Sequence, residues 1–188
     1  MIRKLQRVGV VVGLLLTLEK SFAVEFESLA QALAATLKEK KQVLKNSVTV
    51  RGRTVDYYMR KDVKPDKATI AFVQKEVYDP NCTHTWVIGV DSSRHRVTSI
   101  REVEMSCPHA FPTRQMSFKS QFLGKTRADI PKMKDSIDFI AKATGSSELL
   151  RDSIVRSIEG SAMISGQGAP PKGAPKSSAK TPPATTKR

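Results

Sequence analysis

The chain has 188 residues, of which 39% are hydrophobic, so it can form one ordinary domain with attachments but not a protein of many membrane spans. Its formal net charge of +14 would suit a nucleic-acid-binding protein, but much of that charge lies at the two ends. Residues 1–23 carry four basic residues against one acidic residue, and residues 161–188 carry five with no acid. Aromatic residues make up only 6%, and no basic run is interleaved with them as single-strand binding requires. We therefore expect no nucleic-acid partner.

The first 23 residues are typical of a secretory signal peptide. Met1–Arg7 is basic, Val8–Leu18 is mostly apolar, and Ser21 and Ala23 are small residues at the two positions that a signal peptidase reads. The apolar run is too short for a membrane span, which needs about 20 residues. We expect a periplasmic or secreted protein, with an uncleaved membrane anchor as the alternative.

Residues 24–64 are expected to form a helix and a lead-in to the main domain. Apolar residues recur at helical spacing over 24–45, and the opposite face carries Glu, Gln and Lys, which predicts an amphipathic helix. Two short strands, 48–50 and 55–59, could follow around a turn at Arg51 and Gly52.

The clearest predicted element is a β-hairpin. Residues 68–77 are rich in β-branched and aromatic side chains, and Thr83–Asp91 alternates with Trp86, Ile88 and Val90 on one face. The turn residues of 91–94 then lead into a second alternating run, Arg96–Met105. These runs predict an α+β fold, with a small antiparallel sheet and flanking helices in a single domain.

The second half of the chain returns to helices. Two prolines at 108 and 112 stop the last strand, and Ser117–Leu123 predicts one or two helical turns that end at Gly124. Apolar residues at helical spacing predict a final amphipathic helix that runs to about Glu159. Residues 161–188 are mostly Gly, Pro, Ala, Ser, Thr and Lys, and this basic tail is predicted to be disordered.

The segment before the last helix is a candidate phosphate site. Thr144, Ser146 and Ser147 bring three hydroxyl groups to a helix N-terminus, where unpaired N–H groups and the helix dipole favour an anion. A simpler interpretation is that Ser146 or Ser147 caps the helix and nothing is bound.

The same segment resembles the flavin-attachment motif of the FMN-binding domain family, which includes flavoprotein subunits of membrane redox pumps and many extracytoplasmic electron-transfer proteins. The family pattern is an Asp, two further residues, then Ser-Gly-Ala-Thr-x-Ser/Thr. Here Asp138 stands six residues before Thr144, and Ala141 and Lys142 replace the Ser-Gly pair. Phe118–Lys125 also resembles a Phe-x-x-x-Phe-x-Gly-Lys segment of the family. The resemblance covers residues 65–160, which we treat as the FMN-binding-like domain.

The resemblance implies an FMN cofactor joined through a phosphodiester to the hydroxyl of Thr144, and a flavin transferase that recognises the segment from Asp138. Whether the FMN is held covalently or not stays open at this stage. The chain would then carry electrons between redox partner proteins rather than act on a substrate of its own. The residues expected to contact the cofactor are His109, Arg114, Asp138, Lys142, Ala143, Thr144, Gly145, Ser146 and Ser147.

The two cysteines, Cys82 and Cys107, are expected to form a disulfide, because a secretory route leads to an oxidising compartment. The predicted hairpin brings them close together, and such a bond would stabilise the fold by roughly 3–4 kcal/mol. Two alternatives remain open. Cys82, His84, Cys107 and His109 could bind a metal as two Cys-x-His units, or the thiols could be free.

A rival hypothesis is a non-redox binding module in the periplasm or outside the cell, stabilised by a Cys82–Cys107 disulfide. Its basic tail could then contact an anionic membrane surface. Hydrolase signatures such as Gly-x-Ser-x-Gly or His-Glu-x-x-His do not occur in the chain, and no catalytic residue is predicted.

Overall fold

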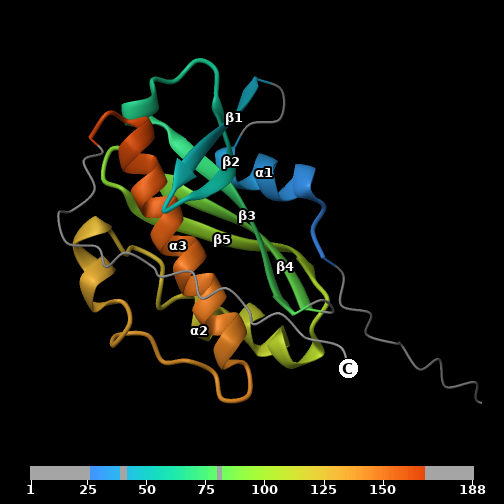
Figure 1. Ribbon diagram of the computed structural model, residues 1–188. Coiled ribbons are helices and arrows are strands. Elements are labelled where there is room, and N and C mark those ends of the chain that lie inside the picture. The colour runs from blue at the N-terminus through green and yellow to red at the C-terminus, as the bar shows by residue number, and fades with distance from the viewer. Residues whose placement is uncertain (1–25, 39–41, 80–81, 168–188) are drawn as a thin grey trace, which may run out of the picture.

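The computed structural model describes residues 26–38, 42–79 and 82–167. The predicted signal peptide and most of the predicted tail lie outside the described residues. The described chain is a single α+β domain, as predicted, in which helices flank one five-stranded antiparallel sheet (Figure 1). The helices and strands in chain order are α1 (Leu29–Leu37), β1 (Val43–Val50), β2 (Arg53–Arg60), β3 (Thr69–Asp79), β4 (Cys82–Asp91), β5 (Arg96–Met105), α2 (Met116–Lys119) and α3 (Thr144–Ile164).

The strands pair in sequence order, β1-β2-β3-β4-β5, so every connection within the sheet joins neighbours. The β4–β5 hairpin and the preceding strand are confirmed. The two tentative strands before it are also confirmed, and they extend the same sheet as β1 and β2. Their two-residue turn uses Arg51 and Gly52, both with positive φ, of 51° and 77°, as tight hairpins require.

The N-terminal helix is shorter than predicted. It begins with a capping box between Ser28 and Gln31 and ends at Leu37, where Lys38 adopts a left-handed φ of 54°. The prediction of helix over 24–45 is therefore wrong at its end, because β1 begins at Val43 and pairs with β2 from that residue on. The apolar residues Val43 and Leu44 happen to continue the helical spacing but belong to the sheet.

The sheet lies between two helices, and its central strands are buried on both faces. The long helix α3 runs across one face, where its Ile154 and Ile158 pack with Phe72 and Trp86 of the sheet (Figure 1). On the opposite face, α1 covers a smaller cluster of Ala32, Leu37, Ala71, Val73 and Val87. No helix among the described residues is both long and apolar enough to cross a membrane.

Two short 3₁₀ helices complete the region around α3. One, η2 (Pro108–Arg114), follows β5 and contains both predicted strand-breaking prolines. The other, η3 (Arg127–Lys132), precedes the loop that carries Asp138. Helix α3 then starts at Thr144 and continues to Ile164, a few residues beyond the predicted end. The 3₁₀ helix η2 and the start of α3 lie at the same end of the molecule (Figure 1). The fold therefore brings Cys107 and the residues after it close to the segment around Thr144.

Candidate functional site

A cavity of about 440 Å³ lies at the N-terminus of α3. Its wall is formed by Tyr78 at the end of β3, the Cys82–Cys107 pair, Pro108–Ala110 of η2 and Lys142–Ser146. Three parts of the chain that are distant in sequence therefore contribute to this cavity, namely Tyr78 with Cys82, residues 107–110 and residues 142–146. The volume lies within the range of about 300–1,000 Å³ that is usual for small-molecule sites.

The N-terminus of α3 has no side-chain cap. Its N-cap residue is Ala143, so the interpretation of a serine cap is wrong. Ser147 Oγ donates to the carbonyl of Ala143 instead, and Ser146 Oγ lies 3.1 Å from His84 Nε2. The first helical bond runs from Ser147 N to Ala143 O, so the N–H groups of Thr144, Gly145 and Ser146 have no acceptor within the described chain. This end of the helix can donate to an anion in the cavity.

The backbone before the helix adopts a left-handed conformation at one residue. Lys142, two residues before Thr144, has a φ of 67°, in the left-handed region that favours glycine. Thr144 is exposed and lines the cavity. Gly145 packs directly under the ring of Tyr78, and any Cβ at this position would overlap that ring.

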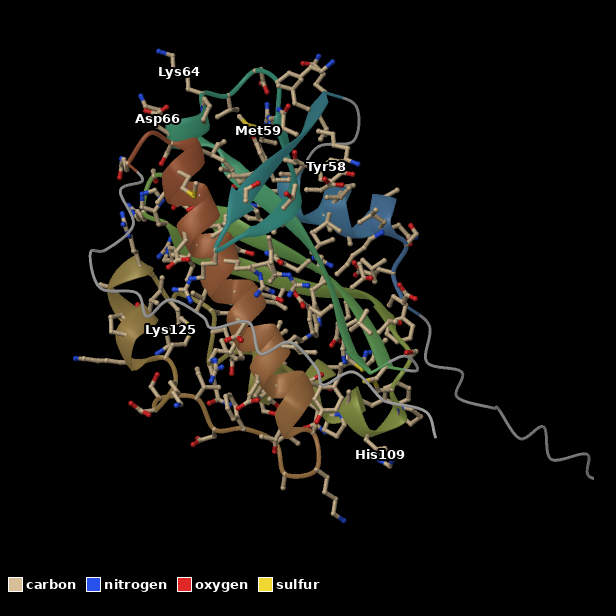
Figure 2. All side chains as sticks on the ribbon, viewed as in Figure 1. Tyr58, Met59, Lys64, Asp66, His109 and Lys125 are labelled. Atoms are coloured by element: carbon tan, nitrogen blue, oxygen red, sulfur yellow. A yellow bond between two sulfur atoms is a disulfide. The ribbon has the colours of Figure 1, made fainter. Side chains whose placement is uncertain are left out.

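The disulfide between Cys82 and Cys107 is confirmed. It joins the start of β4 to the residue before η2, with a Cα–Cα distance of 4.9 Å. The metal-binding alternative needs two free thiolates, and here each sulfur is bonded to the other. His109, the fourth residue of that alternative set, is exposed at the rim of the cavity, at the end of the molecule where α3 begins (Figure 2).

His84 is the buried polar group next to the disulfide. Its Nε2 lies 3.5 Å from Cys82 Sγ and 3.7 Å from Cys107 Sγ, and its side chain is only 1% exposed. The ring stacks on Trp86 with a centroid distance of 4.9 Å, and Nδ1 has no hydrogen-bond partner in the described structure. Burial lowers the pKa of His84, because the charged imidazolium loses its hydration there.

Three of the predicted cofactor residues do not line this cavity. Arg114 instead pairs with Glu102 at 3.3 Å and lies over the Phe26 ring. Asp138 is exposed on the loop before α3, where its backbone N–H donates to Gln121 Oε1 at 2.8 Å. Ser147 is fully buried and its hydroxyl points back to the helix. Tyr78 could not be predicted as a site residue from the sequence, because an aromatic residue at the end of a strand carries no signal of its own.

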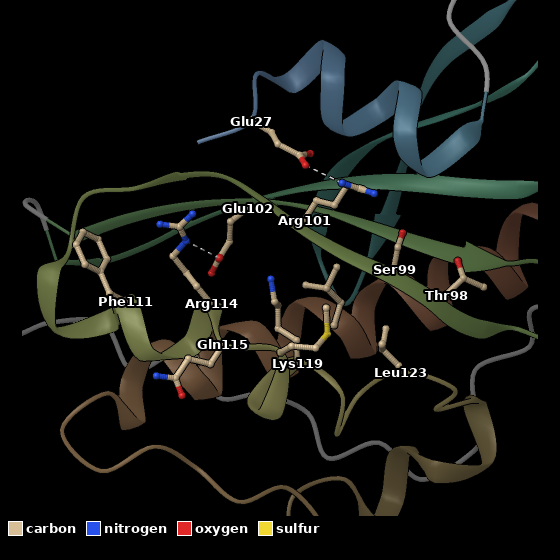
Figure 3. Close-up of a pocket in the computed structure, with 12 residues that line it drawn as sticks. Glu27, Thr98, Ser99, Arg101, Glu102, Phe111, Arg114, Gln115, Lys119 and Leu123 are labelled. Carbon is tan, nitrogen blue, oxygen red and sulfur yellow. Dashed lines mark hydrogen bonds and ion pairs between the residues drawn. The ribbon is translucent and has the colours of Figure 1, made fainter. Parts of the chain in front are cut away.

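A second, larger cavity of about 730 Å³ lies beside β5, between that edge strand and η2 and α2 (Figure 3). Ser99 Oγ and Arg101 Nε are buried in or near its wall without a hydrogen-bond partner in the described chain, and Glu102 Oε2 has only its ion pair with Arg114. Burial raises the pKa of Glu102, partly opposed by the nearby cations of Lys119 and Arg114. The cavity therefore has polar groups that a ligand could satisfy, but it contains no residue of the Thr144 segment.

No family model, no curated protein and no solved structure matches this chain.

Proposed function

We propose that this protein is an FMN-binding extracytoplasmic electron carrier, with FMN attached through a phosphodiester to Thr144. The single observation that carries the proposal is the cavity at the start of α3. It combines an exposed threonine hydroxyl, an uncapped helix N-terminus and room for a small molecule. The resemblance of residues 138–147 to the attachment motif supplies the identity of the ligand.

The phosphate end of FMN fits the start of α3. The N–H groups of Thr144, Gly145 and Ser146 are available there, and the positive end of the helix dipole favours an anion. The side chain of Lys142 is exposed beside the same cavity and adds a cation. No acidic residue stands in the first turn of α3 to compete with the phosphate.

The flavin ring fits the part of the cavity beside Tyr78. Tyr78 is 62% exposed at one side, and an exposed tyrosine ring can stack on a planar heterocycle. Pro108, His109 and the disulfide also line the cavity. When bound, the flavin would supply the redox chemistry. The chain would hold its phosphate, cover one side of the ring and leave the other side open to a partner protein.

The backbone at Lys142 supports covalent attachment. A lysine at a φ of 67° is strained, since non-glycine residues avoid this region. The turn is followed by the N-cap residue Ala143, and it leaves Thr144, the first residue of α3, exposed. Asp138 is likewise exposed, so a flavin transferase could contact both ends of the motif.

The test is the intact mass of the full chain after co-expression with a flavin transferase. Wild type should gain the mass of FMN less one water, and Thr144→Ala should not. Thr49→Ala, which removes an exposed hydroxyl on β1, is the matched control and should be modified like wild type. Wild-type protein that gains no mass and carries no flavin through purification contradicts the proposal.

A second candidate function, a non-redox binding module, is favoured by the cavity beside β5. Its polar atoms without a hydrogen-bond partner in the described chain, on Ser99 and Arg101, indicate a site for a polar ligand. The two functions are separated by the same co-expression experiment. A colourless, unmodified protein would leave the binding module as the better hypothesis.

A further inference from the structure

We propose that the Cys82–Cys107 disulfide is redox-active, that it exchanges electron pairs with thiols through the cavity at the start of α3, and that His84 is the positioning residue for this exchange. The partner class is a dithiol or disulfide, either on a second protein or as a small molecule. This inference goes beyond the proposed function, since it needs no flavin.

The position of the disulfide is the first argument. It forms part of a cavity wall, so a small molecule can reach it. A disulfide that only joined two chain segments would not need to be accessible. Cys82 is half-buried and Cys107 is 8% exposed, so an incoming thiol reaches Cys82 first. The described structure thus distinguishes an attacked sulfur from a leaving sulfur.

The contact with His84 is the second argument. Its Nε2 lies 3.5 Å from Cys82 Sγ and 3.7 Å from Cys107 Sγ, close enough to hydrogen-bond either sulfur once the disulfide is broken. A histidine is costly to bury, and an apolar side chain would fill the same space on Trp86 without an unpaired Nδ1. A buried imidazole with one nitrogen on a disulfide is instead suited to stabilise a departing thiolate.

The surroundings of His84 include a helix terminus, and the cavity that holds the disulfide is also lined by Lys142 and His109. Ser146 of α3 contacts the same Nε2 at 3.1 Å, and the start of α3 favours a negative sulfur. Glu76 is opposite His84 in the β3–β4 register, but its carboxylate pairs with Arg53 at 2.6 Å and with Arg156. Because burial lowers the pKa of His84, the ring is neutral near pH 7 and can donate a single hydrogen bond.

The exchange step balances with a dithiol as the reductant. A thiolate of the dithiol attacks Cys82 Sγ, the Cys82–Cys107 bond breaks, and its electron pair passes to Cys107 Sγ, which accepts a hydrogen bond from His84 Nε2. The second thiol of the dithiol then displaces Cys82 from the mixed disulfide. The dithiol becomes a disulfide, the protein gains two electrons, and the two thiol protons of the reagent end on the two protein sulfurs.

The experiment uses the full chain expressed without a flavin transferase, so its result does not depend on FMN. The oxidised protein is mixed with reduced dithiothreitol, thiols are trapped at intervals, and the reduced fraction is measured by mass across a pH series. His84→Phe keeps a ring on Trp86 and removes both nitrogens, and His84→Gln is the second variant in case the first does not fold. His95→Asn is the control, since His95 is the other buried histidine and bonds Ser161 and Gln167.

We expect wild type to be reduced reversibly while folded. Reduction of the His84 variants should be about tenfold slower at neutral and alkaline pH, where the neutral ring keeps its N–H donor, and the difference should widen at acid pH as the ring gains a proton. His95→Asn should follow wild type. A folded wild type that resists a large excess of dithiol overturns the proposal. So does a His84 variant that loses thermal stability but keeps the wild-type rate and pH profile, because His84 would then be only structural.

Discussion

The strained turn at Lys142 gives a prediction that can be worked out in free energy. A left-handed φ costs an L-residue roughly 1–2 kcal/mol, and Lys142 adopts a φ of 67°. Glycine avoids this cost but loses about 0.5–1 kcal/mol more backbone entropy on folding. Lys142→Gly should therefore raise the free energy of unfolding by about 0.5–1 kcal/mol. For a domain of this size, that corresponds to an increase in Tm of about 2–5 °C.

The assay is thermal or urea unfolding of the two proteins without cofactor. Lys134→Gly is the matched control, because Lys134 is exposed in the same loop and is not among the described residues with positive φ. Lys134→Gly should lower the free energy of unfolding or leave it unchanged, since glycine raises the backbone entropy of the unfolded chain and there is no left-handed strain at residue 134 to relieve. If Lys142→Gly is destabilised as much as Lys134→Gly, residue 142 does not have a left-handed backbone. The resemblance of Lys142 to the glycine of the attachment motif would then lose its structural support.

Two further predictions test the packing of α3 and the cavity beside β5. Gly160→Ala should lower the free energy of unfolding, measured in urea, by about 1–3 kcal/mol, because the added Cβ would lie 2.9 Å from the Phe72 ring. Gly166→Ala is the comparison variant: its added Cβ would meet no atom within 4 Å, but Gly166 has a φ of 76°, so this variant tests backbone strain alone. Glu102→Gln tests the buried carboxyl. A raised folded-state pKa means that the native state binds more protons than the unfolded state, so wild type loses stability relative to Glu102→Gln as the pH rises from the ordinary glutamate pKa to the folded pKa. Unfolding curves at several pH values check this, and a difference that does not change with pH would contradict it.

Local patterns in the sequence predicted most of the fold. The β4–β5 hairpin was predictable because alternation, β-branched residues and the turn at 91–94 all agree. The exact faces of β5 were not, because the register shifts by one residue between Gly89 and Val90. Val90 pairs with Val97 and Gly89 with Ser99, so Val97 joins Ile100 in one core although strict alternation places them on opposite faces.

The candidate site was predicted in parts and not as a whole. The Thr144 segment and the cysteine pair each have a local signature, and the structure brings them to one cavity. Nothing in the sequence indicates that meeting, because it depends on how η2 and α3 pack at the end of the sheet. For the same reason Arg114 was assigned to the cofactor, whereas the fold directs it to the buried carboxylate of Glu102.

The central claim, that Thr144 carries FMN, is tested most directly by peptide mapping of the co-expressed protein. Trypsin cleaves after Lys142 and Arg151, so it releases Ala143–Arg151, a peptide with one threonine and two serines. We predict that this peptide carries the mass of FMN less one water and that fragmentation places it on Thr144. An unmodified peptide, or a flavin located on Ser146 or Ser147, would contradict the account.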